Sequence, residues 1–194
     1  MDPAHNVPDQ LDVLTDALEN PGTDLHTVLA VLVDDLAAAV PSLLGLHLTI
    51  LVAGDPVTLT TGSADPLPPA ASLHVPLDEL TTAEEGSTVT FYAGRPGAFV
   101  DLAADIRHAY GLDGHVVIDG HLDEPVSVQD SKRTTGVTGL TEFSVINQAI
   151  GVLIEQGQPP DTARDELARR AQRAGTTLSG AAHRLLDEHP PATR

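Results

Sequence analysis

The chain has 194 residues, of which 41% are apolar, enough for one or two domains with packed cores. It contains no cysteine, which excludes disulfides, thiol nucleophiles and cysteine-ligated metals. The net charge of -18 would repel nucleic acid if it were spread evenly. Residues 1–141, however, contain 4 basic and 21 acidic side chains, whereas residues 142–194 contain 6 and 7. The acidity therefore belongs to the N-terminal part of the chain.

No apolar run in the sequence approaches the length needed to cross a bilayer. The first ten residues, MDPAHNVPDQ, lack the basic and then apolar order of a signal peptide. We therefore expect a cytoplasmic protein with no membrane partner.

Two helices are predicted near the N-terminus, because apolar residues recur there at intervals of three and four. The first ends at the breaker Asn20-Pro21-Gly22, and the second extends from about Asp24 to Val40. Beyond Pro41 the apolar period changes to two and predicts strands. The expected strands are Leu46–Ala53, Val57–Thr61, Ser72–Leu77, Thr88–Ala93 and His115–Asp119, with a helix from about Ala98 to Tyr110 before the last of them. This order predicts an α+β domain with an antiparallel sheet and helices on one side.

Residues 120–139 are polar and rich in glycine, and we interpret them mainly as a linker. The predicted organisation is a sheet domain over residues 1–122, a linker over residues 123–139 and a helical domain over residues 140–189.

The C-terminal third predicts three short helices. The first has a helical apolar stripe and ends near Gly157, a residue suited to a left-handed cap. The second begins at Pro159-Pro160-Asp161, which suits a first helical turn. Its expected buried face consists of Ala163, Leu167, Ala171 and Ala174, with Gly175 beyond its end. Thr176 or Thr177 can cap the third helix.

These helices carry an apolar skeleton that resembles the ANTAR domain of bacterial transcription antitermination regulators. The matching residues are Ile146-x-Gln148-Ala149-x-Gly151-x-Leu153, Ala163-x-x-x-Leu167-x-x-x-Ala171, and Leu178, Ala182 and Leu185. The resemblance covers about the last quarter of the chain and implies an all-α three-helix unit that binds paired RNA hairpins. The chain departs from the family pattern at contact positions. Ile150 replaces a usual lysine, Arg164 an aromatic residue and Ala168 an arginine, while Gly175 and Thr177 replace an asparagine and a basic residue.

The element order of the N-terminal domain resembles the GAF family of small-molecule sensor domains, which commonly precede ANTAR units. The resemblance implies a sensor or dimerisation domain with an unknown small-molecule ligand. The Asn-Lys-Phe-Asp-Glu signature of the cyclic-nucleotide-binding members is missing, and the absence of cysteine excludes a covalently attached bilin. We therefore predict no cofactor.

The predicted nucleic-acid-binding residues are arginines of the last two helices, namely Arg164, Arg169, Arg170, Arg173 and Arg184. At 100° per residue, Arg169, Arg170 and Arg173 share one arc beside the apolar stripe, with Arg164 on its other flank. Such a patch would hold a phosphate backbone. The competing interpretation is that Asp165 and Glu166 form ion pairs with Arg169 and Arg170.

The remaining candidate sites are weaker. His115, Asp119 and His121 would share one face only if the strand continued through Gly120, so a surface loop is the ordinary explanation and no metal is expected. His47 and His74 each lie in a predicted strand and could lie near one another, but packed or edge histidines are the ordinary explanation. No nucleophile elbow, phosphate-binding glycine loop or zinc-protease motif is present, and we predict no enzyme.

The sequence therefore predicts a signal-responsive transcription antitermination regulator that binds RNA hairpins, most effectively as a homodimer. The alternative is a protein-interaction or dimerisation module without RNA binding. Its main support is Ile150, which would widen the apolar stripe of its helix into a helix-pairing surface.

Overall fold

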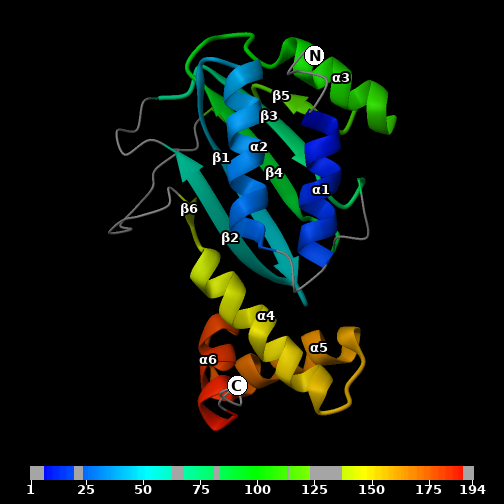
Figure 1. The fold of residues 1–194 in the computed structure, drawn as a ribbon, viewed down its shortest axis with the longest axis vertical. Helices are drawn as coiled ribbons and strands as arrows, with labels where there is room; N and C mark the ends of the chain where they lie inside the picture. The colour runs from blue at the N-terminus through cyan, green and yellow to red at the C-terminus, as the bar shows by residue number, and fades with distance from the viewer. Residues whose placement is uncertain are drawn as a thin grey trace.

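The computed structural model describes residues 7–19, 24–62, 68–80, 84–112, 114–122 and 137–189. Within these residues the chain forms a mixed α+β fold, in which an antiparallel sheet with helices precedes a helical unit (Figure 1). The predicted α+β class is confirmed at this level.

Two helices cover one face of the sheet, α1 (Val7–Glu19) and α2 (Leu25–Ala39), and they pack against each other (Figure 1). Asp24 is the N-cap of α2, and its carboxylate accepts hydrogen bonds from the His26 amide at 3.1 Å and the Thr27 hydroxyl at 2.7 Å. The bond from Thr27 holds the pKa of Asp24 below its usual value. A side-chain cap of this kind explains why the helix begins at the predicted residue.

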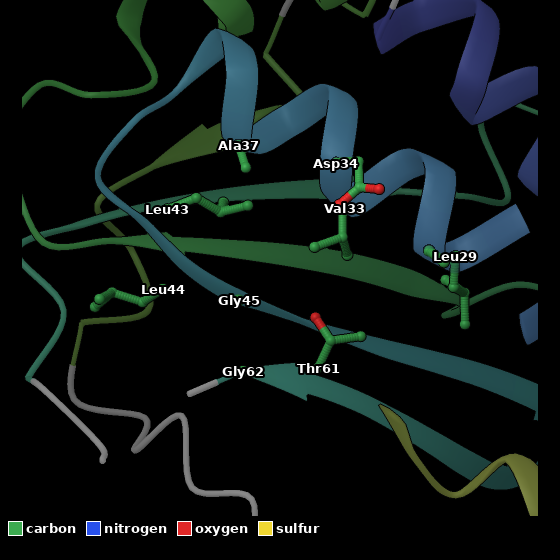
Figure 2. Close-up of a pocket in the computed structure, with 10 residues that line it drawn as sticks. Leu29, Val33, Asp34, Ala37, Leu43, Leu44, Gly45, Thr61 and Gly62 are labelled. Atoms are coloured by element: carbon green, nitrogen blue, oxygen red, sulfur yellow. The ribbon is translucent and has the colours of Figure 1, made fainter. Parts of the chain in front are cut away.

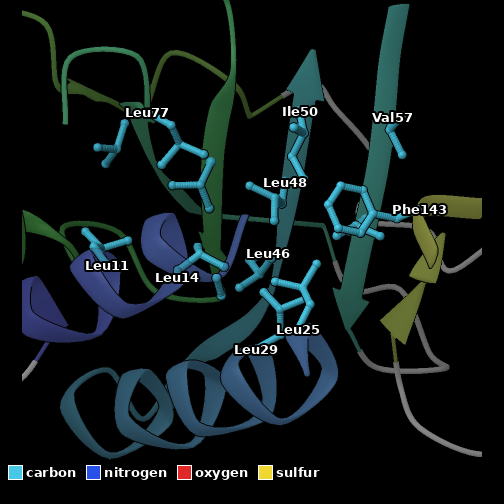
Figure 3. Packing of buried hydrophobic residues seen from close by; sticks show 14 of the residues in the cluster. Leu11, Leu14, Leu25, Leu29, Leu46, Leu48, Ile50, Val57, Leu77 and Phe143 are labelled. Carbon is cyan, nitrogen blue, oxygen red and sulfur yellow. The ribbon is translucent and has the colours of Figure 1, made fainter. Parts of the chain in front are cut away.

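The described strands form one sheet in the order β5-β3-β4-β1-β2-β6, and every neighbouring pair is antiparallel. Their bounds are β1 Leu43–Val52, β2 Asp55–Gly62, β3 Ala71–Pro76, β4 Thr88–Ala93, β5 Val117–Ile118 and β6 Val137–Thr138. Alternate residues of β1 are buried, as a half-covered strand requires, namely Leu46, Leu48, Ile50 and Val52. Figure 3 shows the first three of these within the apolar cluster.

Helix α3 (Val100–Tyr110) is tied to the first helix by a tyrosine. The Tyr110 hydroxyl lies 2.6 Å from the Pro8 carbonyl oxygen and 2.7 Å from Asp12 Oδ1. Burial and the bond to Asp12 both raise the pKa of Tyr110. The helix ends at Gly111, which adopts the left-handed conformation with φ 68°.

The connection to the helical unit is structured at its end. Residues 137 and 138, predicted to belong to the linker, form β6 and pair with Thr61 and Thr60 of β2. Gly139 follows with φ +86°, and a Cβ atom there would overlap the Thr58 carbonyl oxygen. Phe143, one turn into the next helix, is 6% exposed and lies beside Val57 of β2 (Figure 3). The rest of the expected linker lies outside the described residues.

The helical unit consists of α4 (Leu140–Glu155), α5 (Pro160–Ala174) and α6 (Leu178–Glu188), all in mutual contact (Figure 1). The three helices fall where the sequence predicted them. Their shared core contains mostly leucine, isoleucine and alanine, including Ile146, Ala149, Leu153, Leu167, Ala171, Ala182 and Leu185. Alanines at the contacts let these short helices approach one another closely.

Candidate nucleic-acid interface

Local signals in the sequence fix the ends of the two helices that carry the predicted arginines. Pro160 occupies the first turn of α5, where its missing amide proton is not needed, and Gly175 ends the helix with φ 58°. The Thr177 hydroxyl caps α6 by accepting a hydrogen bond from the Gly180 amide at 3.1 Å. The two helices are therefore held as a close pair by a short connection.

The buried face of α5 agrees with the predicted face except at its end. Ala163, Leu167 and Ala171 are buried, and Ala168 joins them at 6% exposure. The prediction for Ala174 is wrong, since this residue is exposed. It lies in the last turn, on the rim of the groove between α5 and α6, where no side chain covers it.

Glu166 is the centre of the arginine cluster, which we define as Arg169, Arg170 and Arg173 together with this carboxylate. Glu166 Oε1 accepts from Arg170 Nε at 3.0 Å and from Arg173 Nη2 at 3.2 Å. Glu166 Oε2 lies 3.2 Å from Arg169 Nη1. One carboxylate thus holds three guanidinium groups from two successive turns of the helix.

The arginine cluster carries a net positive charge, because three guanidinium groups share one carboxylate. The hydrogen bond from Arg170, aided by the charges of Arg169 and Arg173, holds the pKa of Glu166 below its usual value despite partial burial. Glu166 is therefore ionised at neutral pH and cancels one of the three positive charges. Its side chain is only 17% exposed, whereas those of Arg169 and Arg173 are 57% and 68% exposed. The cations face solvent above a carboxylate that lies beneath them.

Arg184 of α6 joins this region across a groove between the two helices. The groove has a volume of about 330 Å³, and its charged lining residues are Arg170, Arg173, Arg184 and Glu188. The apolar part of its lining comes from Ala174, Ala181 and Leu185. Guanidinium groups above an aliphatic floor can contact phosphate oxygens and the flat face of a base or sugar.

Arg164 does not belong to this group. Its guanidinium lies 3.6 Å from the carboxylate of Asp161, one turn earlier on α5. It lines neither the groove nor the surface around Glu166. The structure thus brings four of the five predicted arginines together and leaves Arg164 on the other flank of the helix, as the helical periodicity indicated.

The histidines that suggested a metal site point to different partners. His115 Nδ1 lies 3.1 Å from Glu79 Oε1, while Asp119 Oδ1 accepts from the Ser72 amide at 3.0 Å. His121 stacks on His74 with ring centroids 4.4 Å apart. Among the described residues, no group of three or more histidine and acidic side chains is arranged to hold a metal.

The sheet register also separates the two strand histidines. His47 of β1 and His74 of β3 both pair with Thr90 of β4, so the middle strand lies between them. The His74 ring nitrogen Nδ1 is 2.9 Å from the Thr90 hydroxyl. His47 and His74 therefore lie on either side of Thr90, two strands apart in the sheet.

Comparison of the chain with protein-family models, curated proteins and solved structures found no match. The resemblances to the ANTAR and GAF families stay predictions from the sequence. Separately, none of the helices within the described ranges is long and apolar enough to cross a membrane.

Helical periodicity identified the arginine arc but missed how it is organised. The four-residue spacing predicted two separate pairs, Asp165 with Arg169 and Glu166 with Arg170. In the structure Glu166 contacts both arginines and Arg173 as well, seven residues ahead. The spacing of seven, two helical turns, was the signal that could have revealed this contact. Arg184 and Glu188, one turn apart on α6, could not be placed beside Arg170 and Arg173 without knowing how α5 and α6 cross.

Proposed function

We propose that this chain is a regulator that binds RNA hairpins through the arginine cluster and Arg184. The observation that supports the proposal is the convergence of four arginines at one edge of the three-helix unit, three of them bonded to the single carboxylate of Glu166. Because Glu166 restrains Arg169, Arg170 and Arg173, less side-chain entropy is lost when these three contact phosphates.

The site suits the backbone of a folded RNA better than an extended single strand. Sequence-tolerant binding of single strands normally uses aromatic side chains on which bases stack. The described residues of the three helices contain one aromatic ring other than histidine, Phe143, and it is buried against the sheet. Charge and shape, not base stacking, would therefore carry the recognition.

Two chains acting together would strengthen a weak site of this kind. A homodimer would present two arginine clusters to an RNA with two hairpins and gain affinity by avidity. Exposed apolar side chains on the outer faces of the first two helices, Val13 at 45% and Val31 at 43% exposure, are candidates for such pairing. The sheet domain would then set the distance between the two clusters.

The competing proposal of a protein-interaction module loses its main sequence argument. Ile150 is 4% exposed and packs inside the three-helix core, so it does not present an apolar face for another helix. What still favours this alternative is charge, since Glu166 and Glu188 offset two of the four clustered arginines.

A gel-shift titration with a two-hairpin RNA tests the RNA proposal. Affinity should fall steeply between about 50 mM and about 200 mM salt, because phosphate binding releases counterions. Arg173→Gln should weaken binding to every hairpin sequence and lower the salt slope by about 1. Arg95→Gln is the matched control, because Arg95 is an exposed arginine of the sheet domain.

If Arg173→Gln and Arg95→Gln behave alike, the arginine cluster is not the binding site. If the wild-type chain shows no salt-sensitive binding to one or two hairpins, RNA is not the ligand and the interaction module becomes the better proposal. A single-hairpin RNA bound as tightly as the two-hairpin RNA would remove the role of avidity.

A further inference from the structure

A second site lies in the sheet domain, away from the arginine cluster. A pocket of about 320 Å³ opens between α2, the start of β1 and the end of β2 (Figure 2). Its volume falls at the lower end of the range for small-molecule sites. Its lining is mostly aliphatic and includes Leu29, Val33, Leu43 and Leu44.

The pocket exists because small residues occur where larger side chains would fill it. Helix α2 turns Ala30 and Ala37 toward it. On the sheet side, Gly45 occupies a bulge where β1 shifts register against β4. A Cβ atom at Gly45 would overlap the Thr61 carbonyl oxygen, so the pairing of β1 with β2 requires glycine there. The sheet side of the hollow is therefore set by the backbone of β1 and β2 at Gly45.

Two polar groups are placed at this apolar surface. Thr61, 5% exposed, rises from β2 toward the pocket, and Asp34 projects from α2 at its rim (Figure 2). Among the described residues of the lining, Asp34 is the one that is ionisable. It lies in the strongly acidic part of the chain, where residues 1–141 carry 21 acidic and 4 basic side chains. An anionic ligand would be repelled here, whereas a cation would be attracted.

We propose that this pocket binds a small amphiphile with an aliphatic body and a cationic ammonium head. The aliphatic body lies against Leu29, Val33 and Leu43, and the ammonium group pairs with the Asp34 carboxylate. A few well-placed polar groups over an apolar lining are the usual composition of ligand pockets. This inference is independent of RNA binding.

The position of the pocket connects it with the helical unit. Thr61, which lines the pocket, pairs directly with Val137 of β6. That strand leads through Gly139 into α4, which begins at Leu140. A ligand against the end of β2 therefore acts one strand away from the start of the three-helix unit.

Binding of n-hexylammonium to the full chain, followed by amide chemical shifts in two-dimensional NMR, tests the proposal. We expect saturable shifts for Gly45, Gly62 and Ala37 at millimolar ligand. Hexan-1-ol, with the same body and no charge, should bind more weakly, and hexanoate weakest of the three. Asp34→Asn should weaken hexylammonium about threefold to fivefold, to the level of hexan-1-ol, because a partly solvated ion pair contributes modestly.

A pair of variants on the same helix locates the site. Ala37→Leu should fill the pocket and abolish the shifts for all three probes. Ala38→Leu adds the same side chain at an exposed position outside the lining and should leave binding unchanged. The amide spectrum of each variant reports whether it is folded.

If none of the three probes gives saturable shifts, the proposal is overturned. Equal binding by the Ala37→Leu and Ala38→Leu variants would also overturn it. Equal affinity of hexylammonium and hexanoate, or an unchanged affinity in Asp34→Asn, would overturn the assignment of a cationic ligand. None of these outcomes depends on whether the chain binds RNA.

Discussion

At the scale of single residues, Glu166 has the largest influence on the candidate interface. A carboxylate between three arginines both lowers the local positive charge and fixes where that charge is displayed. Without it, Arg169 and Arg173 would keep only their bonds to backbone carbonyl groups, and the three side chains would lose more entropy on meeting a phosphate. Its contribution to folding is also sensitive to pH, because contact with the arginines lowers its pKa.

We predict a pH-dependent difference in stability between the wild-type chain and Glu166→Gln. The pKa of Glu166 is lower in the folded chain than its ordinary value of 4.5, so its stabilising effect is complete above that value. It is lost as pH falls through the lowered folded pKa. The melting temperature of the wild type should therefore exceed that of Glu166→Gln by a constant amount from about pH 8 to about pH 6. The gap should close in more acidic solution.

Thermal unfolding followed by circular dichroism measures this gap. Glu155→Gln removes an exposed carboxylate of α4 outside the cluster, and its melting temperature is expected to stay near that of the wild type. If the melting temperatures of the wild type and Glu166→Gln are equal at neutral pH, the three ion pairs contribute nothing to folding stability.

At the scale of elements, the junction between β2, β6 and α4 distinguishes this structure from two domains joined by a loose tether. Gly139 is packed on the β2 backbone, and Phe143 completes the apolar cluster of the sheet domain. The start of the helical unit is thus part of the core of the first domain. Movement of β2 relative to the rest of the sheet would change the direction in which α4 leaves it.

We predict that Gly139→Ala lowers the free energy of unfolding in urea by about 2 kcal/mol or more. The backbone at this position has a positive φ, and the added Cβ would also overlap the Thr58 carbonyl oxygen. Gly111→Ala is the control, since Gly111 also has positive φ but no heavy atom lies within 4 Å of an added Cβ. It should lose only about 1 kcal/mol. Equal losses for the two variants would show that Gly139 is not held against Thr58.

The elements themselves were largely predictable from the sequence, whereas their contacts were not. Periodicity and caps located the helices, since Asp24, Pro160 and Thr177 act through bonds to neighbouring residues. The pairing of β6 with β2 depends on residues about 76 positions apart and has no local signature. A two-residue strand is also too short to show alternation. The pocket beside Gly45 escaped prediction for the same reason, because its walls come from three separate elements.

At the scale of the whole molecule, charge is the dominant property. The net charge of -18 and the isoelectric point near 4.5 describe a chain whose carboxylates repel one another at neutral pH. The arginine cluster lies at one end, in the helical unit, while most of the acidic excess lies in the sheet domain. This separation is what allows a strongly acidic protein to offer a cationic surface.

We predict that moderate salt stabilises the folded chain. Raising ionic strength from about 10 mM to about 150 mM shortens the Debye length from about 30 Å to about 8 Å and screens the repulsion. The melting temperature at pH 7 should rise by roughly 2–4 °C, which corresponds to about 1 kcal/mol for a chain of this length. The increase should shrink at pH 5, nearer the isoelectric point. A decrease at pH 7 would show that ion pairs outweigh repulsion.

The burial of Phe143 beside Val57 has a practical consequence for spectroscopy. The chain has no tryptophan, and both of its tyrosines, Tyr92 and Tyr110, lie in the sheet domain. Tyrosine emission therefore originates entirely from that domain, and the three-helix unit contributes only the weak emission of Phe143. Phe143→Trp would introduce the only tryptophan of the chain, and its emission would report directly on separation of the two units.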